Sequence, residues 1–275
     1  MSGKTVLVTG STDGIGLPTA TSMAAMGATV LVHGRDPGRG AAALAAVQAA
    51  TAAGSPDRAA LYLADLSWLQ RVRALAAQVR RRCQRLDVLV NNAGVYVPRR
   101  LVTRDGLELT FAVNVVAPFL LVRELLPLLV AGAPARIVNL SSASHWAGEM
   151  HWDDLQLEGS YDPLVAYEQS KLAMSLFTFE LARRIKHLGV TAVCLDPGNV
   201  DTGMLRAGWP ELEGIDVATG AMTSVCLASS PEVEGVSGAY YEGGRRTRPS
   251  ASSHDLNAQA RLWAVLEGMT DQPGR

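Results

Sequence analysis

The chain has 275 residues and 48% of them are hydrophobic, so it can bury a sizeable core and is not mainly disordered. Its 25 Lys and Arg residues are balanced by 26 Asp and Glu residues, and the net charge of −1 argues against a protein whose main task is to bind nucleic acid. The length fits one α/β domain, which we predict to span residues 1–275.

Short apolar runs alternate along the chain with Ala-, Leu- and Arg-rich segments of helical length. Most runs are continuous, as expected for strands buried on both faces of a parallel sheet. This order predicts a doubly wound parallel sheet of about seven strands with helices on both faces. The expected strands are Thr5–Thr9, Ala28–His33, Ala59–Ala64, Val88–Asn91, Arg136–Ser141, Val190–Leu195 and Gly238–Glu242. The expected helices are Ile15–Met26, Arg39–Ala53, Trp68–Arg82, Leu107–Val130, Ala166–Leu188 and Ala218–Ala228, with a shorter one near Leu256–Leu266.

Two stretches without periodicity, 143–165 and 198–216, follow expected strands, and a C-terminal tail covers 244–275. Doubly wound sheets bind ligands at the carboxyl ends of their strands, so we expect both stretches to form substrate loops. The arginine run at 80–82 closes an expected helix, where cations are favourable, and is expected to be a solvated face.

The three cysteines, Cys83, Cys194 and Cys226, have no C-x-x-C spacing, and the five histidines form no metal-binding motif, so we expect free thiols and no metal. No basic leader precedes a long apolar stretch, and the apolar window 112–130 is interrupted by proline and charged residues. These features predict a soluble, cytoplasmic protein without a membrane or nucleic-acid partner.

Three glycines, Gly10, Gly14 and Gly16, stand between the first expected strand and the first expected helix. Glycine allows positive φ and lets a pyrophosphate approach the backbone, and a helix N-terminus presents free N–H groups to it. The spacing G-x-x-x-G-x-G is weak by itself, and an ordinary strand–helix turn is the alternative. Its position after the first strand favours dinucleotide binding.

The second expected strand ends in the sequence His33-Gly34-Arg35-Asp36. An acidic residue at this place in a dinucleotide fold takes the ribose 2′-hydroxyl, whereas an arginine accommodates a 2′-phosphate. Arg35 therefore favours NADP(H), with NAD(H) as the alternative, since arginine is abundant here and Asp36 could contact a ribose hydroxyl.

Tyr167 and Lys171 stand four residues apart at the start of the longest expected helix, so they share one face. An ammonium group beside a phenol favours the phenolate and is expected to lower the pKa of Tyr167. A tyrosine tuned in this way exchanges a proton with a carbonyl or alcohol oxygen near neutral pH. Lys171 is one of only three lysines among 25 basic residues, which favours a specific task over a surface helix pair.

Together these motifs resemble the short-chain dehydrogenase/reductase family across nearly the whole chain. The matching residues, in the family's order, are Thr9-Gly10, Gly14-Ile15-Gly16, Asp65-Leu66, Asn91-Asn92-Ala93-Gly94, Asn114, Ser141-Ser142, Tyr167 with Lys171, and Pro197-Gly198. Within the family the chain is similar to the retinol-dehydrogenase-like branch. The features of that branch are the run from Arg136 to Ser142, then Ser144-His145, a long gap to Tyr167, and Arg261-Leu262-Trp263 in the tail.

The resemblance implies an oxidoreductase that interconverts an alcohol and a carbonyl. The resemblance implies that Tyr167 is the general acid/base and that Lys171 holds the nicotinamide ribose. It also implies that Ser142 hydrogen-bonds the substrate oxygen and that Asn114 supports a proton-relay water. It implies cofactor contacts from Gly10, Ser11, Gly14, Ile15, Gly16, Asp65, Leu66, Asn92, Ala93, Gly94, Pro197, Gly198 and Thr202, besides Arg35, Tyr167 and Lys171. Asp13 stands where many NADP-preferring relatives hold a basic residue, so Arg35 is expected to do most of the selecting.

The two loops supply candidates for an apolar substrate pocket because aromatic and Met side chains suit apolar or flat ligands. We expect a carbonyl or alcohol substrate, with a non-catalytic nucleotide-sensing or interaction protein as the alternative function. The resemblance also implies a homodimer or homotetramer. The pocket candidates are His145, Trp146, Met150, Trp152, Met204 and Trp209.

Overall fold

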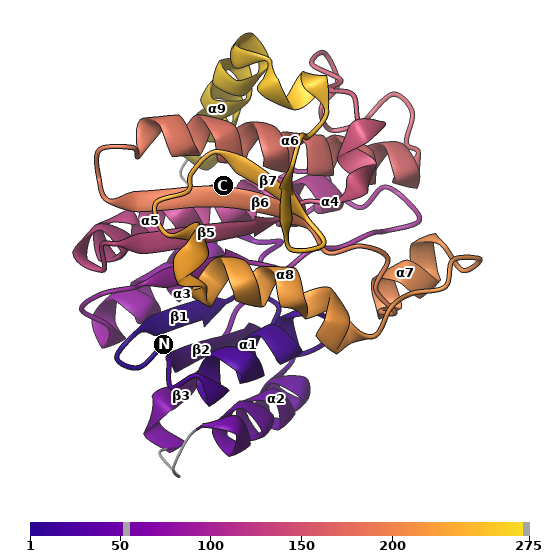
Figure 1. Cartoon of the computed structure of the whole chain (residues 1–275). Helices are drawn as coiled ribbons and strands as arrows, with labels where there is room; N and C mark the ends of the chain where they lie inside the picture. The colour runs from indigo at the N-terminus through magenta and orange to yellow at the C-terminus, as the bar shows by residue number, and fades with distance from the viewer. Residues whose placement is uncertain (52–55, 272–275) are drawn as a thin grey trace.

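The computed structural model of the chain describes residues 1–51 and 56–271. Its strands form one eight-stranded sheet in the order β3-β2-β1-β4-β5-β6-β7-β8 (Figure 1). The predicted doubly wound, largely parallel sheet is confirmed, since only the pairing of β7 with β8 is antiparallel. The strands are β1 (Thr5–Val8), β2 (Thr29–Gly34), β3 (Ala59–Leu63), β4 (Val88–Asn91), β5 (Ala135–Leu140), β6 (Val190–Asp196), β7 (Ala239–Glu242) and β8 (Arg245–Thr247).

The eighth strand, β8, is absent from the sequence prediction. It pairs with β7 through a tight hairpin in which Gly243 and Gly244 both have positive φ, 55° and 76°. A two-residue hairpin turn needs this conformation, and two glycines adopt it at no steric cost. The strand itself, with two arginines and a threonine, has no apolar alternation that would mark it in the sequence.

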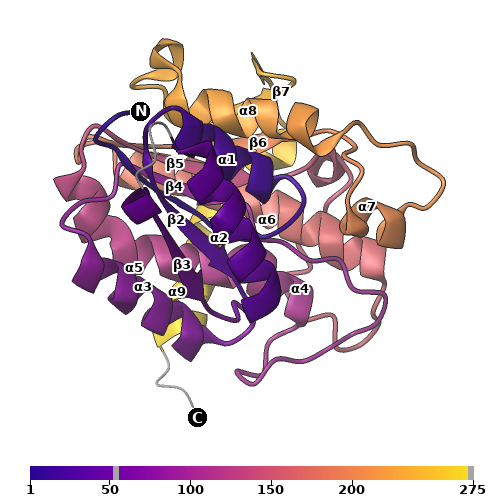
Figure 2. The same cartoon turned by 90° about the horizontal axis from the view of Figure 1, so that it is seen from below.

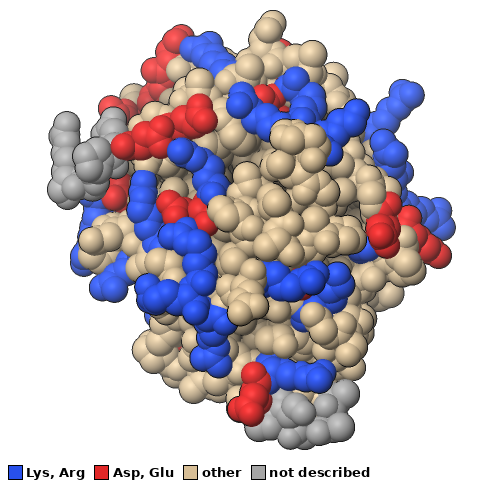
Figure 3. Space-filling model, turned by 90° about the vertical axis from the view of Figure 1, so that its left-hand side faces the viewer, with Lys and Arg blue, Asp and Glu red and all other residues tan. Residues whose placement is uncertain are grey.

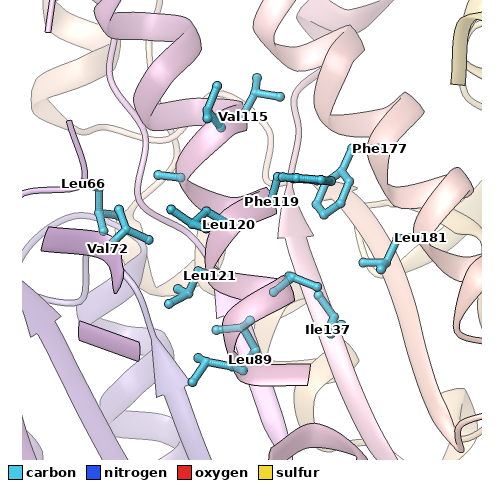
Figure 4. Close-up of a cluster of buried hydrophobic side chains, with 14 of the residues drawn as sticks. Leu66, Val72, Leu89, Val115, Phe119, Leu120, Leu121, Ile137, Phe177 and Leu181 are labelled. Atoms are coloured by element: carbon cyan, nitrogen blue, oxygen red, sulfur yellow. The ribbon is translucent and has the colours of Figure 1, made fainter. Parts of the chain in front are cut away.

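Helices cover both faces of the sheet (Figures 1 and 2). On one face, α1, α2 and α8 pack against strands through a cluster that includes Met23, Val47 and Leu227. The other face is covered by α3, α5, α6 and α9, and Phe119 and Phe177 lie in that cluster with their ring centres 5.6 Å apart (Figure 4). Fully burying a side chain of this size contributes about 1.5–3 kcal/mol, so both layers stabilise the sheet. The helices are α1 (Gly16–Ala25), α2 (Pro37–Ala50), α3 (Leu69–Arg82), α4 (Leu109–Phe111), α5 (Ala117–Ala131), α6 (Pro163–Arg184), α7 (Gly203–Gly208), α8 (Val217–Ser229) and α9 (Leu256–Asp271).

Several expected boundaries are corrected. The expected helix Leu107–Val130 consists of α4, a π-helical segment Ala112–Val116 and α5. Part of the expected irregular stretch 198–216 forms α7. Residues 52–53 of the second expected helix and 272–275 of the tail lie outside the described residues.

The continuous helical segment Leu109–Ala131 is long and apolar enough to cross a membrane, contrary to the expectation that its interruptions exclude this. Pro118 lies in the first turn of α5, where proline fits a helix, and Pro127 is accommodated further along. Most of the apolar window is buried inside the molecule, between α3 and α6, so the segment packs as a core helix here.

On the side of the molecule opposite α7, basic and acidic side chains lie between areas of uncharged surface (Figure 3). Arg81 and Arg82, at the end of α3, are exposed. The neighbouring Arg80 pairs with Glu124 at 2.5 Å. The arginine run therefore forms an exposed, partly paired helix end, as the sequence predicts.

Candidate active site

A cavity of about 330 Å³ lies at the carboxyl ends of the strands, where the strand order reverses between β1 and β4. This is the place where open α/β sheets bind ligands. The chain leaves β1 beside β4, since the Thr9 N–H donates to the Val90 oxygen at 3.0 Å. Predicted cofactor residues that line the cavity are Gly10, Gly14, Ile15, Arg35, Asp65, Leu66, Asn92, Ala93, Gly94, Tyr167, Lys171, Pro197 and Thr202.

The three glycines of the loop after β1 are required for two different reasons. Gly10 and Gly14 have positive φ, 63° and 51°, which other residues rarely adopt. A Cβ on Gly16 would lie 2.3 Å from the Gly10 oxygen, so no larger residue fits where α1 meets the loop. The loop thus packs closely at its base and exposes backbone to the cavity, which fits a bound pyrophosphate.

Two predicted cofactor residues of this loop and one beyond it do not line the cavity: Ser11, Gly16 and Gly198. Ser11 is fully buried, and its Oγ accepts a hydrogen bond from the His33 N–H at 2.9 Å. Its role here is to hold the loop against β2, because its hydroxyl bonds the backbone of that strand.

His33, at the end of β2, braces the glycine loop and was not singled out by the sequence. Its Nδ1 accepts from the Gly10 N–H at 3.1 Å, so its Nε2 carries the proton and donates to the Ala64 oxygen at 3.2 Å. The ring is buried, and burial lowers the pKa of His33 to about 4. A neutral histidine therefore fastens the loop to β2 and to the end of β3.

The segment after β4 braces the same loop from the other side. The Thr9 Oγ1 accepts from the N–H groups of Asn92 and Ala93, both at 3.0 Å. The Asn92 side chain donates to the oxygens of Thr9 and Gly10 at 2.8 and 3.1 Å. The glycine loop and the segment Asn92–Ala93 thus form one hydrogen-bonded unit, which a sequence pattern cannot reveal.

Two arginines, Arg35 and Arg39, line the far end of the cavity. Asp36 does not line it, and its Oδ1 instead caps α2 by accepting from the Arg39 N–H at 2.8 Å. A Cβ on Gly34 would lie 2.4 Å from the Thr12 methyl group, so an acidic side chain at that place has no room. The sequence missed Arg39, whose guanidinium lies 3.7 Å from the Asp13 carboxylate and offsets its charge.

Tyr167 and Lys171 project from the second and third turns of α6, as the sequence predicts. Asp162 caps this helix by accepting from two N–H groups, and Pro163 occupies its first turn, which fixes where the helix begins. The Lys171 Nζ lies 5.3 Å from the centre of the Tyr167 ring and donates to the Leu140 oxygen at 3.1 Å. Both side chains are buried and line the cavity.

The expected lowering of the Tyr167 pKa is not found. Burial raises the pKa of the Tyr167 phenol, and a hydrogen bond with Ser142 offsets only part of this. The pKa of Lys171 shifts in the opposite direction. Burial lowers it to about 8, and the Asp196 carboxylate offsets part of this lowering. The phenol therefore stays protonated at neutral pH in this structure, as a proton donor must.

Ser142 is the serine that meets Tyr167, whereas its neighbour Ser141 has a structural role. The Ser141 Oγ donates to the Lys171 backbone oxygen at 2.9 Å and contacts the Ser175 hydroxyl at 3.0 Å. Ser142 is half-buried and lowers the pKa of the Tyr167 phenol, although it is not part of the cavity lining.

Asn114 lies in the π-helical segment, a backbone form that often occurs at functional sites. Its side chain accepts from the Val95 N–H at 2.8 Å, and it donates to the Val95 oxygen and to the Ser170 hydroxyl, both at 3.0 Å. Asn114 does not line the cavity and here ties the loop after β4 to α6. A proton-relay role stays a prediction.

Three aromatic rings contact one another beside the cavity. The ring centre of Tyr167 lies 5.2 Å from that of Trp209 and 5.9 Å from that of Tyr96, and the latter two lie 5.0 Å apart. Gly208 packs closely against Tyr96, since a Cβ added at Gly208 would lie 3.3 Å from the ring. Met204 lines the cavity, whereas Tyr96 and Trp209 do not and border it only through their contacts with Tyr167. Tyr96 was missed because nothing in the sequence links it to α7.

The other pocket candidates lie elsewhere. His145 is completely buried, and Trp146 is 58% exposed. Met150 is partly buried and packs against the core cluster that contains Phe119 and Phe177. The guanidinium of Arg261 lies over the Trp152 ring, 4.6 Å from the ring centre. None of these four residues lines the described cavity.

The three cysteines are free thiols. Within residues 1–51 and 56–271, no group of three or more His, Cys, Asp or Glu side chains could hold a metal ion.

A family model described as short chain dehydrogenase matches residues 4–212. Human retinol dehydrogenase 14 is 38% identical to this chain over 98% of it and 87% of that protein. Mouse polyprenol dehydrogenase is 38% identical over 95% of this chain and 82% of that protein. These matches cover the glycine loop, the tyrosine–lysine pair and nearly all of the sheet.

Solved structures share the fold. An uncharacterised protein from Mycobacterium paratuberculosis has a TM-score of 0.81 and 30% identity, and the match covers 100% of this chain and 96% of that one. A blue fluorescent protein from a metagenomic library, in complex with NADPH, has a TM-score of 0.69 and 28% identity over 88% of this chain and 98% of that one.

The chain belongs to the short-chain dehydrogenase/reductase family, in its retinol-dehydrogenase-like branch. It is an oxidoreductase that acts on alcohol or carbonyl groups of small molecules with a nicotinamide cofactor.

Proposed function

We propose that this protein interconverts a ketone or aldehyde and the corresponding alcohol of a largely apolar small molecule, using NADP(H). One observation carries the proposal: Tyr167, with the Lys171 ammonium 5.3 Å from its ring centre, lines the same cavity as the glycine loop. Proton donor and dinucleotide cradle are thus parts of one site.

Tyr167 is the proposed proton donor in reduction and the proton acceptor in oxidation. Its phenol, together with the Ser142 hydroxyl that lowers its pKa, would hydrogen-bond the charge that develops on the substrate oxygen. Lys171 adds a cation next to the Tyr167 ring and so favours the phenolate that forms when the proton leaves.

The cofactor, when bound, supplies or accepts the hydride. The residues present fit it, because the close packing of Gly16 against Gly10 leaves the exposed backbone of the loop free to receive a pyrophosphate. Gly10, Gly14 and Ile15 would hold the phosphates, and Lys171 with Thr202 would hold the nicotinamide end.

The proposed preference for NADP(H) over NAD(H) rests on the two arginines of the cavity lining. Arg35 and Arg39 both line the cavity, and planar guanidinium groups suit a phosphate. Within the part of the chain that the structure describes, Arg35 has no ion-pair partner, so its charge is available to a ligand. The NADPH complex of a 28% identical protein supports the same choice.

The substrate proposal rests on Met204, which lines the cavity, and on Tyr96 and Trp209, whose rings contact that of Tyr167 and give its surroundings an aromatic and apolar character. Relatives named for retinol and polyprenol agree with an apolar substrate. A cytoplasmic location, the absence of a membrane partner and a homodimer or homotetramer stay predictions; α9 packs against α6 within the same chain and so covers part of that helix.

The test is oxidation of NADPH by the purified protein with a panel of apolar and polar ketones and aldehydes. We expect turnover of apolar members and a kcat/KM at least about tenfold higher with NADPH than with NADH. Tight NADPH binding without turnover of any carbonyl, or of any alcohol with NADP⁺, would instead support a nucleotide-sensing protein.

A further inference from the structure

The imidazole of His145 joins two segments that are far apart in the chain. Its Nδ1 lies 2.7 Å from the Ser142 backbone oxygen, and its Nε2 lies 3.0 Å from the backbone nitrogen of Ser250. The ring is completely buried, and its centre lies 4.7 Å from that of Tyr240 on β7. His145 therefore stands between the end of β5 and the segment that follows β8.

These two contacts define the state of the ring. A backbone N–H can only donate, so Nε2 presents its lone pair to Ser250. A backbone oxygen can only accept, so Nδ1 carries the proton and donates it to Ser142. Only the neutral Nδ1–H tautomer satisfies both partners. Burial also lowers the pKa of His145, which keeps the ring neutral.

The Ser142 end of this bridge bears on the catalytic site. The Ser142 oxygen accepts both from the His145 side chain and from the His145 N–H, the latter at 3.1 Å. Its hydroxyl accepts from the Ser144 N–H at 3.2 Å and donates to the Ser144 hydroxyl at 3.3 Å. It is also close enough to the Tyr167 phenol to lower the pKa of that group. Carbonyl and hydroxyl belong to one residue in extended conformation, so fixing the carbonyl restricts where the hydroxyl points.

The Ser250 end is itself held in place. Ser250 is buried, and its hydroxyl lies 2.8 Å from that of Ser253. The Ser253 backbone oxygen accepts from the Gln259 side chain, which lies on α9, at 2.7 Å. The match to the family model ends at residue 212, so this anchor belongs to the part of the chain beyond it.

We propose that His145 is a positioning residue, which holds the Ser142 hydroxyl against Tyr167 by fastening the Ser142 carbonyl to the anchored backbone of Ser250. The proposal rests on the proposed function, because it gives His145 an effect only through the role of Ser142. It also gives the C-terminal segment a part in catalysis without any contact with substrate.

Two variants separate the halves of the bridge. In His145→Asn the amide nitrogen can replace Nδ1 and keep the bond to Ser142. In His145→Gln the amide oxygen can reach the position of Nε2 and keep the bond to Ser250, but the bond to Ser142 is lost. We expect His145→Gln to lower kcat about fivefold to tenfold with little change in the Kd for NADPH, and His145→Asn to lower it less. The exposed His254, replaced by Asn, is the matched control and should leave kcat unchanged.

The decisive comparison places His145→Gln in a Ser142→Ala background. If His145 acts through the Ser142 hydroxyl, its effect on kcat disappears there. An equal loss in both backgrounds would mean a merely structural role and would overturn the proposal. If Ser142→Ala itself leaves kcat unchanged, the assigned role of Ser142 fails, and the positioning proposal fails with it.

A second route does not change the histidine. Ser250→Pro removes the N–H that holds Nε2, at a residue whose φ of −55° suits proline, whereas Ser250→Ala keeps that N–H. We expect a lower kcat from the proline variant only, again absent in the Ser142→Ala background. Equal activity of the two Ser250 variants would overturn the proposal even if His145→Gln does not fold.

Discussion

The ammonium group of Lys171 lies 5.3 Å from the centre of the Tyr167 ring, and both side chains are buried beside the cavity. This arrangement makes the charge of Lys171 dependent on pH in the working range. Burial lowers the pKa of Lys171 to about 8, so the ammonium is lost as pH rises through that value.

We therefore expect kcat/KM for carbonyl reduction to fall above about pH 8, by about tenfold for each pH unit. In Lys171→Arg the overall rate should be lower, but this decline should be absent because a guanidinium stays charged. A pH–rate profile from pH 6 to 10 measures both. Lys186→Arg, which changes an exposed lysine, is the control and should keep the decline. The same decline in Lys171→Arg would contradict the assignment.

The ring contacts of Trp209 predict its effect on substrate binding. Trp209→Ala removes a large apolar surface 5.2 Å from the Tyr167 ring, so KM for an apolar carbonyl should rise about tenfold while kcat changes less. Trp152→Ala is the matched control, because Trp152 stacks with Arg261 and not with Tyr167. Steady-state kinetics with one apolar ketone compares them. A similar rise in KM for both variants would show that Trp209 acts through loop folding and not through a substrate contact.

Much of the fold follows from local sequence signals. Continuous apolar runs such as the one in β1 mark buried parallel strands, and a strand with two arginines such as β8 carries no such mark. The start of α6 shows a similar limit. Asp162 and Pro163 form a capping signal four residues before the predicted start at Ala166, because apolar periodicity alone does not include the cap.

Some residues of the candidate site could likewise be predicted from the sequence and others could not. Tyr167, Lys171 and the glycines could be predicted because each lies in a short motif with fixed spacing. Tyr96 and Arg39 could not, since their importance depends on which loop folds beside which strand. His145 was placed in the substrate pocket because it follows the active-site strand, but its polar atoms turn inward to satisfy two backbone groups.

The two arginines at the far end of the cavity predict cofactor choice. Arg35→Ala and Arg39→Ala should each raise the Kd for NADPH about tenfold and leave the Kd for NADH nearly unchanged, since only the 2′-phosphate contact is lost. Both arginines are exposed, so the effect should shrink as salt is raised. Fluorescence titration with both cofactors measures this, and Arg261→Ala is a distant control. Equal weakening of NADPH and NADH would rule out selection by these side chains.

The buried His33 predicts a loss of stability in acid. Its pKa is about 4 in the folded protein, against about 6.5 in the unfolded chain, so the unfolded chain binds the proton first. Stability should be complete above about pH 6.5 and should fall by about 3 kcal/mol as pH drops towards 4. Thermal unfolding across this range, compared with His33→Gln, isolates the effect. We expect a shallower pH dependence in the variant, and an unchanged slope would show that His33 does not contribute.

The most direct test of the central claim is the turnover number of Tyr167→Phe with NADPH and the best apolar carbonyl substrate. We expect kcat to fall about 10²- to 10⁴-fold, with the Kd for NADPH changed by less than about threefold, because only the proton donor is removed. Tyr161→Phe is the matched control, since the Tyr161 hydroxyl donates to the Val97 oxygen at 3.0 Å, and it should keep nearly full activity. Wild-type turnover by Tyr167→Phe would contradict the account.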